Sequence, residues 1–269
     1  MTATKNNKTG IRIRSIEDWA EKVAVKKTKK HVIQDLLPAK KGEYMAIAGR
    51  TGIGKTNLTL HLAFCLSTGT PFYGLKCWRS KVAFLEFEGD DSNIMDRYNK
   101  IKNYFPSTEK RLKFGMIPLS NPKDMFEDIL TQTEGCPMLI IDPVKFLIPG
   151  DYLKPKDASS FIRRFKEMLS SNKKVAIISL PIRKPNEKSL IQPGDVYSMK
   201  GATEYADSAT SVLLLEKKSY SRENSDQVTL HFAKSRIASQ HLETLDLNFN
   251  RKKCLFESKN DIVIETAEE

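Results

Sequence analysis

The sequence predicts an α/β fold: a mostly parallel central sheet flanked by helices, with antiparallel strands at the C-terminal end. Two patterns support this prediction. From residue 43 to about residue 181, short apolar runs alternate with helical segments, as in parallel sheets that are covered on both faces. After residue 210, four strand-like runs follow one another with short polar turns between them, which indicates an antiparallel extension of the sheet.

The expected elements follow the chain in a regular order. The run EYMAIAG is expected to form a strand over 43–49, and a helix is expected over about 55–66 after a glycine-rich loop. The alternation then places strands at 81–89, 112–119, 137–143 and 174–181. It places the intervening helices at 92–104, 122–133 and 157–171. The C-terminal strands are expected at 211–217, 227–234, 242–249 and 253–258.

This order predicts one main domain over residues 31–257. A basic N-terminal arm with a short helix is expected over residues 1–30, where Ser15 and Asp18 resemble a capping box. An acidic C-terminal tail is expected over residues 258–269.

The composition limits the kinds of partner. Lys and Arg total 44 against 33 Asp and Glu, so the formal net charge is +11. A positive field attracts polyanions such as nucleic acid, although the excess charge also serves plain solubility. No apolar run approaches the length of a membrane span, so no membrane partner is expected. The cysteines lack metal-ligand or redox spacing and are expected to be reduced thiols, which suits a cytoplasmic protein.

The glycine-rich loop fits the pattern G-x-x-x-x-G-K-[ST] between a predicted strand and a predicted helix. Glycines allow the backbone to curl so that amide N–H groups point at phosphate oxygens, and the helix N-terminus favours the same anion. Lys55 can reach terminal phosphates, and the Thr56 hydroxyl can take a Mg2+ position. A loop with coincidental glycines is the alternative. The nucleotide-binding residues predicted here are Gly49, Arg50, Thr51, Gly52, Ile53, Gly54, Lys55 and Thr56.

Carboxylates end two of the predicted strands. Asp142 ends the apolar run MLIID, so a buried strand would deliver it to the ligand-binding edge, where it can hold Mg2+ through water. A turn-capping role beside Pro143 is the alternative. Glu86 and Glu88 lie on one face of the strand over 81–89, and Glu88 is nearer its C-terminal end. Glu88 can orient or deprotonate an attacking water, or it can belong to a solvated acidic turn.

These motifs together resemble the RecA-type ATPases, and more narrowly the hexameric replicative helicases of the DnaB and plasmid RepA kind. The resemblance spans about residues 33–240, and it is clearest in DLLPAKKGEYMAIAGRTGIGKTNLTLHLA, KVAFLEFEGDDSNIMDRYNKI and MLIIDPVKFLIPGD. It implies a RecA-like P-loop NTPase fold with ATP and Mg2+ as cofactors. It also implies that Glu88 activates water and that Asp142 is the acid linked to the metal.

A later stretch, LHFAKSRIAS, resembles the Lys-x-Arg finger of this family and corresponds to Lys234 and Arg236. In the family these residues reach the γ-phosphate held by the neighbouring subunit, which implies a ring or a filament with active sites at subunit interfaces. The homo-oligomer expected from the resemblance is a hexameric ring. Ile237 and Ala238 replace the usual Asn-Gly turn. In KVAIISLPIRK, the segment Leu180-Pro181 stands where the family has a Gln or His that senses the γ-phosphate.

The resemblance also implies two loops that bind single-stranded DNA, LIPGDYLKPKDAS and IRKPNEKSLIQPGDVYSMK. Tyr152 and Tyr197 are candidates for stacking on bases. Ordinary long polar loops are the alternative. The candidate contacts to the nucleic-acid backbone are Lys154, Lys156, Arg183, Lys184, Lys188 and Lys200.

Three activities fit these features. The first is a Mg-ATP-dependent DNA motor, a RepA-like helicase or translocase that acts as a ring on single-stranded DNA. The second is a recombinase-like ATPase that forms filaments on DNA without unwinding it. The third is a KaiC-like ATPase whose nucleotide state regulates protein partners. The basic loops support the first two activities, and Leu180 at the sensor position supports the third.

Overall fold

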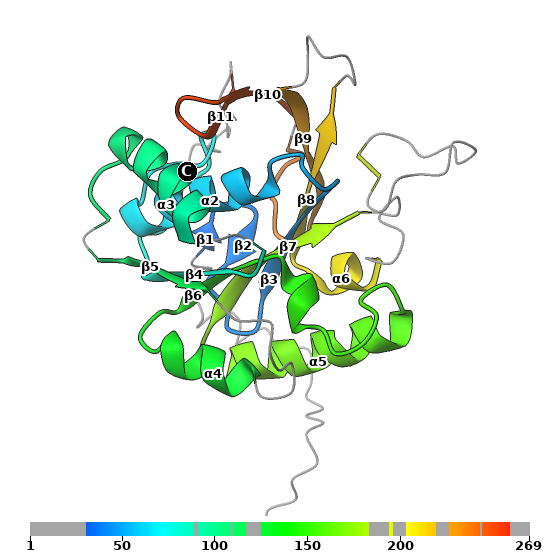
Figure 1. The fold of residues 1–269 in the computed structure, drawn as a ribbon. Coiled ribbons are helices and arrows are strands. Elements are labelled where there is room, and N and C mark those ends of the chain that lie inside the picture. The colour runs from blue at the N-terminus through cyan, green and yellow to red at the C-terminus, as the bar shows by residue number, and fades with distance from the viewer. Residues whose placement is uncertain are drawn as a thin grey trace, which may run out of the picture. The chain divides into compact units, whose positions relative to one another are not determined.

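Figure 1 shows the fold of the chain in a computed structural model. The structure describes residues 31–88, 91–108, 110–116, 125–182, 194–195, 203–218, 226–242 and 244–258. The predicted N-terminal helix and residues 259–269 of the predicted acidic tail lie outside these ranges. The proposed domain limits therefore stay predictions.

The main sheet of the described residues has nine strands in the order β11-β10-β9-β8-β3-β7-β6-β4-β5. The six strands from β5 to β8 in this order pair in parallel, and β9, β10 and β11 continue the sheet antiparallel. This confirms the predicted fold class. The strands are β3 (Tyr44–Gly49), β4 (Val82–Glu86), β5 (Leu112–Met116), β6 (Met138–Asp142), β7 (Val175–Pro181), β8 (Ser211–Lys217), β9 (Gln227–Ser235), β10 (Leu245–Asn250) and β11 (Leu255–Ser258).

Helices cover both faces of this sheet (Figure 1). On one face lie α2 (Lys55–Thr68) and α3 (Asp91–Ile101), which is followed by the short η1 (Lys102–Tyr104). On the other face lie α4 (Met125–Gln132), α5 (Pro155–Ser171), α6 (Thr203–Ser208) and the short η2 (Val144–Leu147). The central parallel strands are apolar along almost their whole length because both of their faces are buried.

The alternation of side chains decides which residues face which layer of helices. In β6, Met138 and Ile140 pack in the core under α2, whereas Leu139 and Ile141 pack in the core under α5. Asp142 continues the first set and therefore lies on the α2 face. The register aligns Glu86 with Asp142 and aligns Gly49 with Pro181. The carboxyl ends of the central strands thus meet along one edge of the sheet.

A small sheet of β1 (His31–Ile33) and β2 (Leu37–Pro38) precedes the main one and was not predicted. Its connecting turn is joined to β8 and β9 by two hydroxyl donors. Ser211 Oγ donates to Leu36 O at 2.5 Å, and Ser235 Oγ donates to Asp35 O at 2.5 Å. Strands this short carry too little side-chain periodicity to be recognised in a sequence.

Helix α2 is surrounded by other elements, and its residues 58–60 and 62–67 are all buried. His61 lies on its remaining side among the rings of Phe72, Tyr73 and Phe105, whose centroids are 5.4, 5.2 and 5.7 Å away. Burial disfavours the charged imidazolium and lowers the pKa of His61 from 6.5 to about 4.

This burial predicts a loss of stability in mild acid. Above pH 6.5 the imidazole is neutral in both the folded and the unfolded chain, so its full contribution is present. As the pH falls from 6.5 towards 4, only the unfolded chain binds the proton, which costs the fold about 3 kcal/mol. We expect His61→Phe to remove this part of the pH dependence, as measured by urea unfolding at a series of pH values.

The exposed His241 provides the control, because His241→Gln should leave the slope of the wild-type curve in place. If the unfolding free energy changes with pH equally in wild type and in His61→Phe, His61 is not the source of this pH dependence.

Candidate nucleotide-binding site

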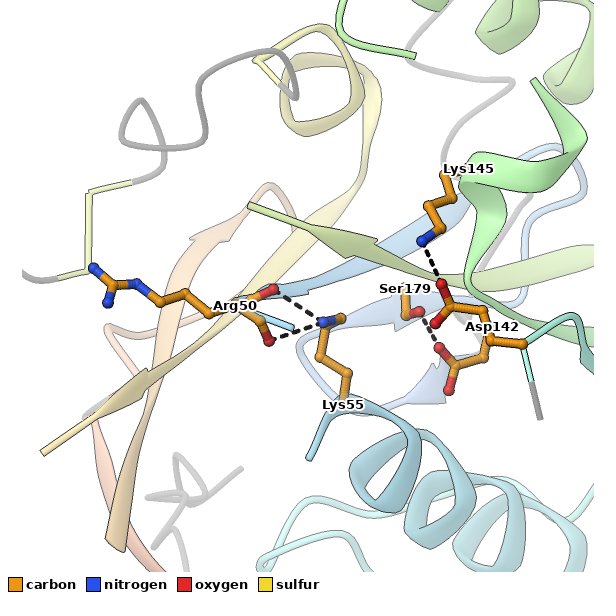
Figure 2. A network of polar contacts seen from close by, with 7 residues as sticks. Arg50, Lys55, Asp142, Lys145 and Ser179 are labelled. Atoms are coloured by element: carbon orange, nitrogen blue, oxygen red, sulfur yellow. Dashed lines mark hydrogen bonds and ion pairs between the residues drawn. The ribbon is translucent and has the colours of Figure 1, made fainter. Parts of the chain in front are cut away.

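The predicted phosphate loop connects β3 to α2 at the centre of the sheet, where β3 lies between β7 and β8. Gly52 and Gly54 have φ values of +77° and +100°, which L side chains rarely adopt. Lys55 Nζ donates to the carbonyl oxygens of Gly49 and Arg50 at 3.0 and 3.1 Å, so its side chain lies back across the loop (Figure 2). The Arg50 side chain extends away from Lys55. The backbone therefore has the curled form that the glycine pattern predicts.

The last strand supports this loop from outside. A Cβ atom on Gly54 would lie 2.6 Å from Phe256 Cζ in β11, so the ring leaves room only for glycine. Phe256 is itself held in place, because Tyr73 Oη donates to its carbonyl oxygen at 2.9 Å and the centroid of the Phe249 ring lies 5.0 Å away. No local pattern in the sequence indicates this contact.

The Asp142 carboxylate is buried, with 2% of the residue exposed, and it lies on the α2 face at the end of β6. Thr59 Oγ1 donates to Oδ2 at 2.9 Å, and Ser179 Oγ donates to Oδ1. Thr59 lies one helical turn after Thr56, and Ser179 follows Ile177 on the same face of β7. These two contacts fix the orientation of the carboxylate, and Figure 2 shows Ser179 directed at Asp142. Neither Thr59 nor Ser179 was predicted as a site residue. The spacing of two between Ile177 and Ser179 does place the Ser179 side chain on the α2 face of β7.

Two acidic residues end the neighbouring strand. Glu86 is 5% exposed and pairs in register with Asp142, whereas Glu88 lies two residues beyond the strand with about half of its side chain exposed. Lys145 Nζ donates to Glu88 Oε1. Lys145 belongs to η2, three residues after Asp142, and its ammonium points into the site in Figure 2. This lysine was not predicted as a site residue.

Charges from three elements act on Lys55. Burial is the largest effect and lowers the pKa of Lys55 below 10.5. The carboxylates of Asp142 and Glu88 oppose this shift, and the positive charge of Lys145 adds to it. Cations and anions therefore share one small region. A polyphosphate entering it would meet Lys55 as a partly desolvated cation that gains from a new anion.

The end of β7 departs from the sequence-based expectation. Leu180 is fully buried in the core under α5, so its side chain lies on the face away from the loop. Pro181 is the residue that pairs in register with Gly49. Proline offers neither a polar side chain nor an N–H group. The residue of β7 that lies beside the loop is thus Pro181, and Leu180 packs the core.

The predicted finger lies at the opposite end of the sheet. Lys234 pairs in register with Val212 near the start of β8, and Val212 pairs in register with Ala46 of β3. Gly49 lies three residues further along β3 than Ala46, or roughly 10 Å along the strand. Lys234 and Arg236 therefore lie far from the phosphate loop of their own chain.

Both finger residues contact the C-terminal end of α6. Lys234 Nζ donates to the carbonyl oxygens of Ala206 and Asp207 at 2.5 and 2.9 Å, and Arg236 also donates to Asp207 O. Cations are favourable at this end of a helix because its carbonyl groups are unpaired there.

The predicted nucleic-acid contacts are only partly described. Lys154 and Lys156 are exposed at the start of α5. The preceding loop is ordered by Asp157, whose Oδ2 accepts from Asp151 N at 3.1 Å. Tyr152 is partly buried against the core under α5. The other predicted residues lie outside the described ranges: Arg183, Lys184, Lys188, Tyr197 and Lys200.

Comparisons with known proteins show the family and the fold of the chain. A family model described as an AAA domain matches residues 11–180, which is more than half of the chain. The chain belongs to this AAA domain family. One solved structure, itself an ATPase domain, superposes on the chain with a TM-score of 0.60 and 14% sequence identity, covering 90% of this chain and 95% of that one. At this identity the likeness shows the fold alone. No curated protein matched the chain.

The AAA domain assignment and the shared fold confirm the predicted RecA-type P-loop ATPase. Several further findings concern the described residues alone. None of their helices is long and apolar enough to cross a membrane. Within the same ranges, no group of three or more His, Cys, Asp or Glu side chains forms a metal site. The four cysteines are free and buried.

The contact between Gly54 and Phe256 predicts a difference between two glycines of the ATPase loop. Gly52→Ala should cost about 1–2 kcal/mol of unfolding free energy, because its backbone is left-handed but nothing lies within 4 Å of a new Cβ. Gly54→Ala should cost about 1–3 kcal/mol more, because the Phe256 ring must also move. Denaturant unfolding without nucleotide measures both changes.

The double variant Gly54→Ala, Phe256→Leu isolates the contact. Its cost should be smaller than the sum of the two single costs, because a smaller side chain gives room to the new methyl group. Additive costs would show that Phe256 does not restrict residue 54.

Proposed function

We propose that this chain is a Mg-ATP-dependent DNA motor, a RepA-like helicase or translocase that acts as a homohexameric ring on single-stranded DNA in the cytoplasm. The observation that carries the proposal is the division of charged groups between the two ends of one sheet. Lys55, Asp142 and Glu88 gather at the carboxyl ends of the strands, and Lys234 and Arg236 lie at the opposite end. A site that needs both groups is completed by a second copy of the chain.

ATP is the proposed substrate of the loop. Backbone amides of residues 49–56 would surround the phosphates, and Lys55 would leave the carbonyl oxygens of Gly49 and Arg50 for them. The partly desolvated ammonium gains more from the phosphates than from neutral carbonyl groups.

The residues present also fit Mg2+. The Thr56 hydroxyl and the Asp142 carboxylate are hard oxygen donors of the kind this ion prefers, and they belong to the first turn of α2 and the end of β6. Thr59 and Ser179 keep the Asp142 carboxylate in one orientation, which suits an acceptor that would hold Mg2+ through a bound water molecule. When bound, the ion would neutralise charge on the phosphates.

Glu88 is the proposed residue that orients and deprotonates the attacking water. It is the more exposed of the two glutamates at this edge, whereas Glu86 is buried beside Asp142. A carboxylate that contacts solvent beside the phosphates can accept a proton from water.

Lys234 and Arg236 are the proposed finger for the neighbouring site. Negative charge spreads over the equatorial oxygens during phosphoryl transfer, and a cation from the next subunit stabilises it. Because the finger lies roughly 10 Å along the sheet from its own loop and two strands away from β3, hydrolysis would require assembly. Successive hydrolysis at neighbouring sites can then move the subunits relative to one another.

Single-stranded DNA is the proposed track. The net charge of +11 and the exposed Lys154 and Lys156 support binding to a phosphate backbone. The contacts proposed for Arg183, Lys184, Lys188 and Lys200 rest on the resemblance to the helicases. Pro181 at the sensor position favours a second candidate, a KaiC-like ATPase that regulates protein partners without unwinding.

We expect Glu88→Gln to retain ATP binding and to lower the rate of hydrolysis by about 100-fold or more, because the amide cannot accept the proton from water. Oligomers should accumulate in ATP, since the nucleotide that joins the subunits is no longer consumed. Phosphate release and mass in solution measure these effects.

Glu127→Gln, at an exposed position of α4, is the matched control and should turn over ATP at the wild-type rate. Normal hydrolysis by Glu88→Gln would remove this residue from the mechanism.

In the wild type, single-stranded DNA should stimulate turnover and forked duplexes should be unwound. Turnover indifferent to DNA would favour the KaiC-like candidate.

Mixing Lys55→Ala chains with Arg236→Ala chains tests the shared site. Each variant alone should be inactive, because every site lacks either its loop lysine or its finger. In an equal mixture, about a quarter of the interfaces combine an intact loop with an intact finger, so part of the ATPase activity should return. No recovery, in mixtures shown to assemble, would mean that the finger does not serve the neighbour.

A further inference from the structure

Lys145 is a charged group at the site to which the proposed reaction assigns no role. Its ammonium donates to Glu88 Oε1, so the proposed water-activating carboxylate already has a cation as its partner. Figure 2 shows Lys145, Lys55 and Asp142 in one network of polar contacts. A carboxylate oxygen that accepts a hydrogen bond from an ammonium is not free to accept one from water in the same place.

Aromatic packing holds this ion pair in place. Phe87 and Phe146, the chain neighbours of Glu88 and Lys145, stack with ring centroids 6.2 Å apart and an interplanar angle of 21°. Lys145 Nζ lies 4.6 Å from the centroid of the Phe146 ring. Phe87 N also donates to Asp142 O at 3.2 Å, which joins the ends of β4 and β6. These contacts hold the segments that follow β4 and β6 against each other, and these segments carry Glu88 and Lys145.

The pair is nevertheless open to exchange. The side chains of Lys145 and Glu88 are 26% and 48% exposed, and ion pairs with this much solvent contact are weak. The charge of Lys145 also reaches Lys55, whose pKa it helps to lower. A phosphate bound by Lys55 would thus enter the field of Lys145 as well, with more negative charge than one carboxylate.

The end of β7 does not supply a phosphate contact. Pro181 faces Gly49 and offers no hydrogen-bond donor, and Leu180 is buried on the far face. Ser179 is already used by Asp142. Over the described residues of β7, therefore, no side chain is placed to contact a terminal phosphate, whereas Lys145 follows the end of the adjacent strand β6.

We propose that Lys145 is a positioning residue that exchanges partners, binding Glu88 until a terminal phosphate is present and then binding the phosphate. This inference rests on the proposed function, because it assumes that the loop binds ATP. Release of Glu88 would let its carboxylate accept a hydrogen bond from water only while ATP is bound. The triphosphate would then switch on the base that hydrolyses it, and ADP would leave the base paired with Lys145.

The first experiment compares binding of a non-hydrolysable ATP analogue, AMP-PNP, with binding of ADP by calorimetry. We expect Lys145→Met to weaken AMP-PNP binding about tenfold relative to ADP, since a charge-assisted contact to the terminal phosphate is lost. Lys145→Arg keeps the cation and should retain most of the wild-type preference. Lys113→Met, at an exposed position of β5, removes the same charge elsewhere and should behave as wild type.

The second experiment tests the exchange itself through Glu88→Gln. With Lys145 present, this change should tighten AMP-PNP binding, because the phosphate no longer competes with a carboxylate for the ammonium. In the Lys145→Met background the gain should be smaller, because only the repulsion between the carboxylate and the phosphates is then relieved. Affinity for ADP in every variant reports whether the site is folded.

The outcomes separate the two proposals. If the wild type binds neither nucleotide, the proposed ATPase function fails. If both nucleotides bind but Lys145→Met keeps the wild-type preference for AMP-PNP, the nucleotide site stands and the role of Lys145 is overturned. An equal gain from Glu88→Gln with and without Lys145 would likewise overturn the exchange.

Discussion

The burial of the Asp142 carboxylate is the constraint on which the rest of the site depends. An ionised carboxylate without partners in the interior costs on the order of several kcal/mol. Thr59 of α2 and Ser179 of β7 supply the donors, so a helix and two adjacent strands are held in one arrangement by a single side chain. Because α2 directly follows the phosphate loop, the same contacts also set the distance from the loop to the ends of β4 and β6.

Much of this architecture could be predicted from local patterns. Strands β3, β6 and β7 are apolar on both faces, and each is bounded by polar or glycine-rich residues, so their existence and order are recognisable. The loop at residues 49–56 is recognisable because its glycines serve backbone angles that few other residues adopt. Asp142 is distinctive as a charge at the end of an apolar run. In each case the decisive information lies within a few neighbouring residues.

The contacts that could not be predicted join residues far apart in the chain. Nothing near Gly54 indicates that the Phe256 ring covers it, and nothing near Glu88 indicates Lys145. The position of Leu180 shows a second difficulty. A shift of one residue along a strand moves a side chain to the other face, so the motif located the end of β7 but not the residue that faces the loop.

The placement of Lys234 and Arg236 near the amino ends of β3 and β8, far from Lys55, has a geometric consequence for assembly. In the proposed oligomer, each copy carries a donating surface and an accepting surface on different sides, so adjacent copies meet head to tail. An open row of such copies leaves one donating surface and one accepting surface without a partner copy at its two ends. Closing the row into a ring joins these two surfaces. The ring therefore has one more complete active site than an open row of the same number of copies.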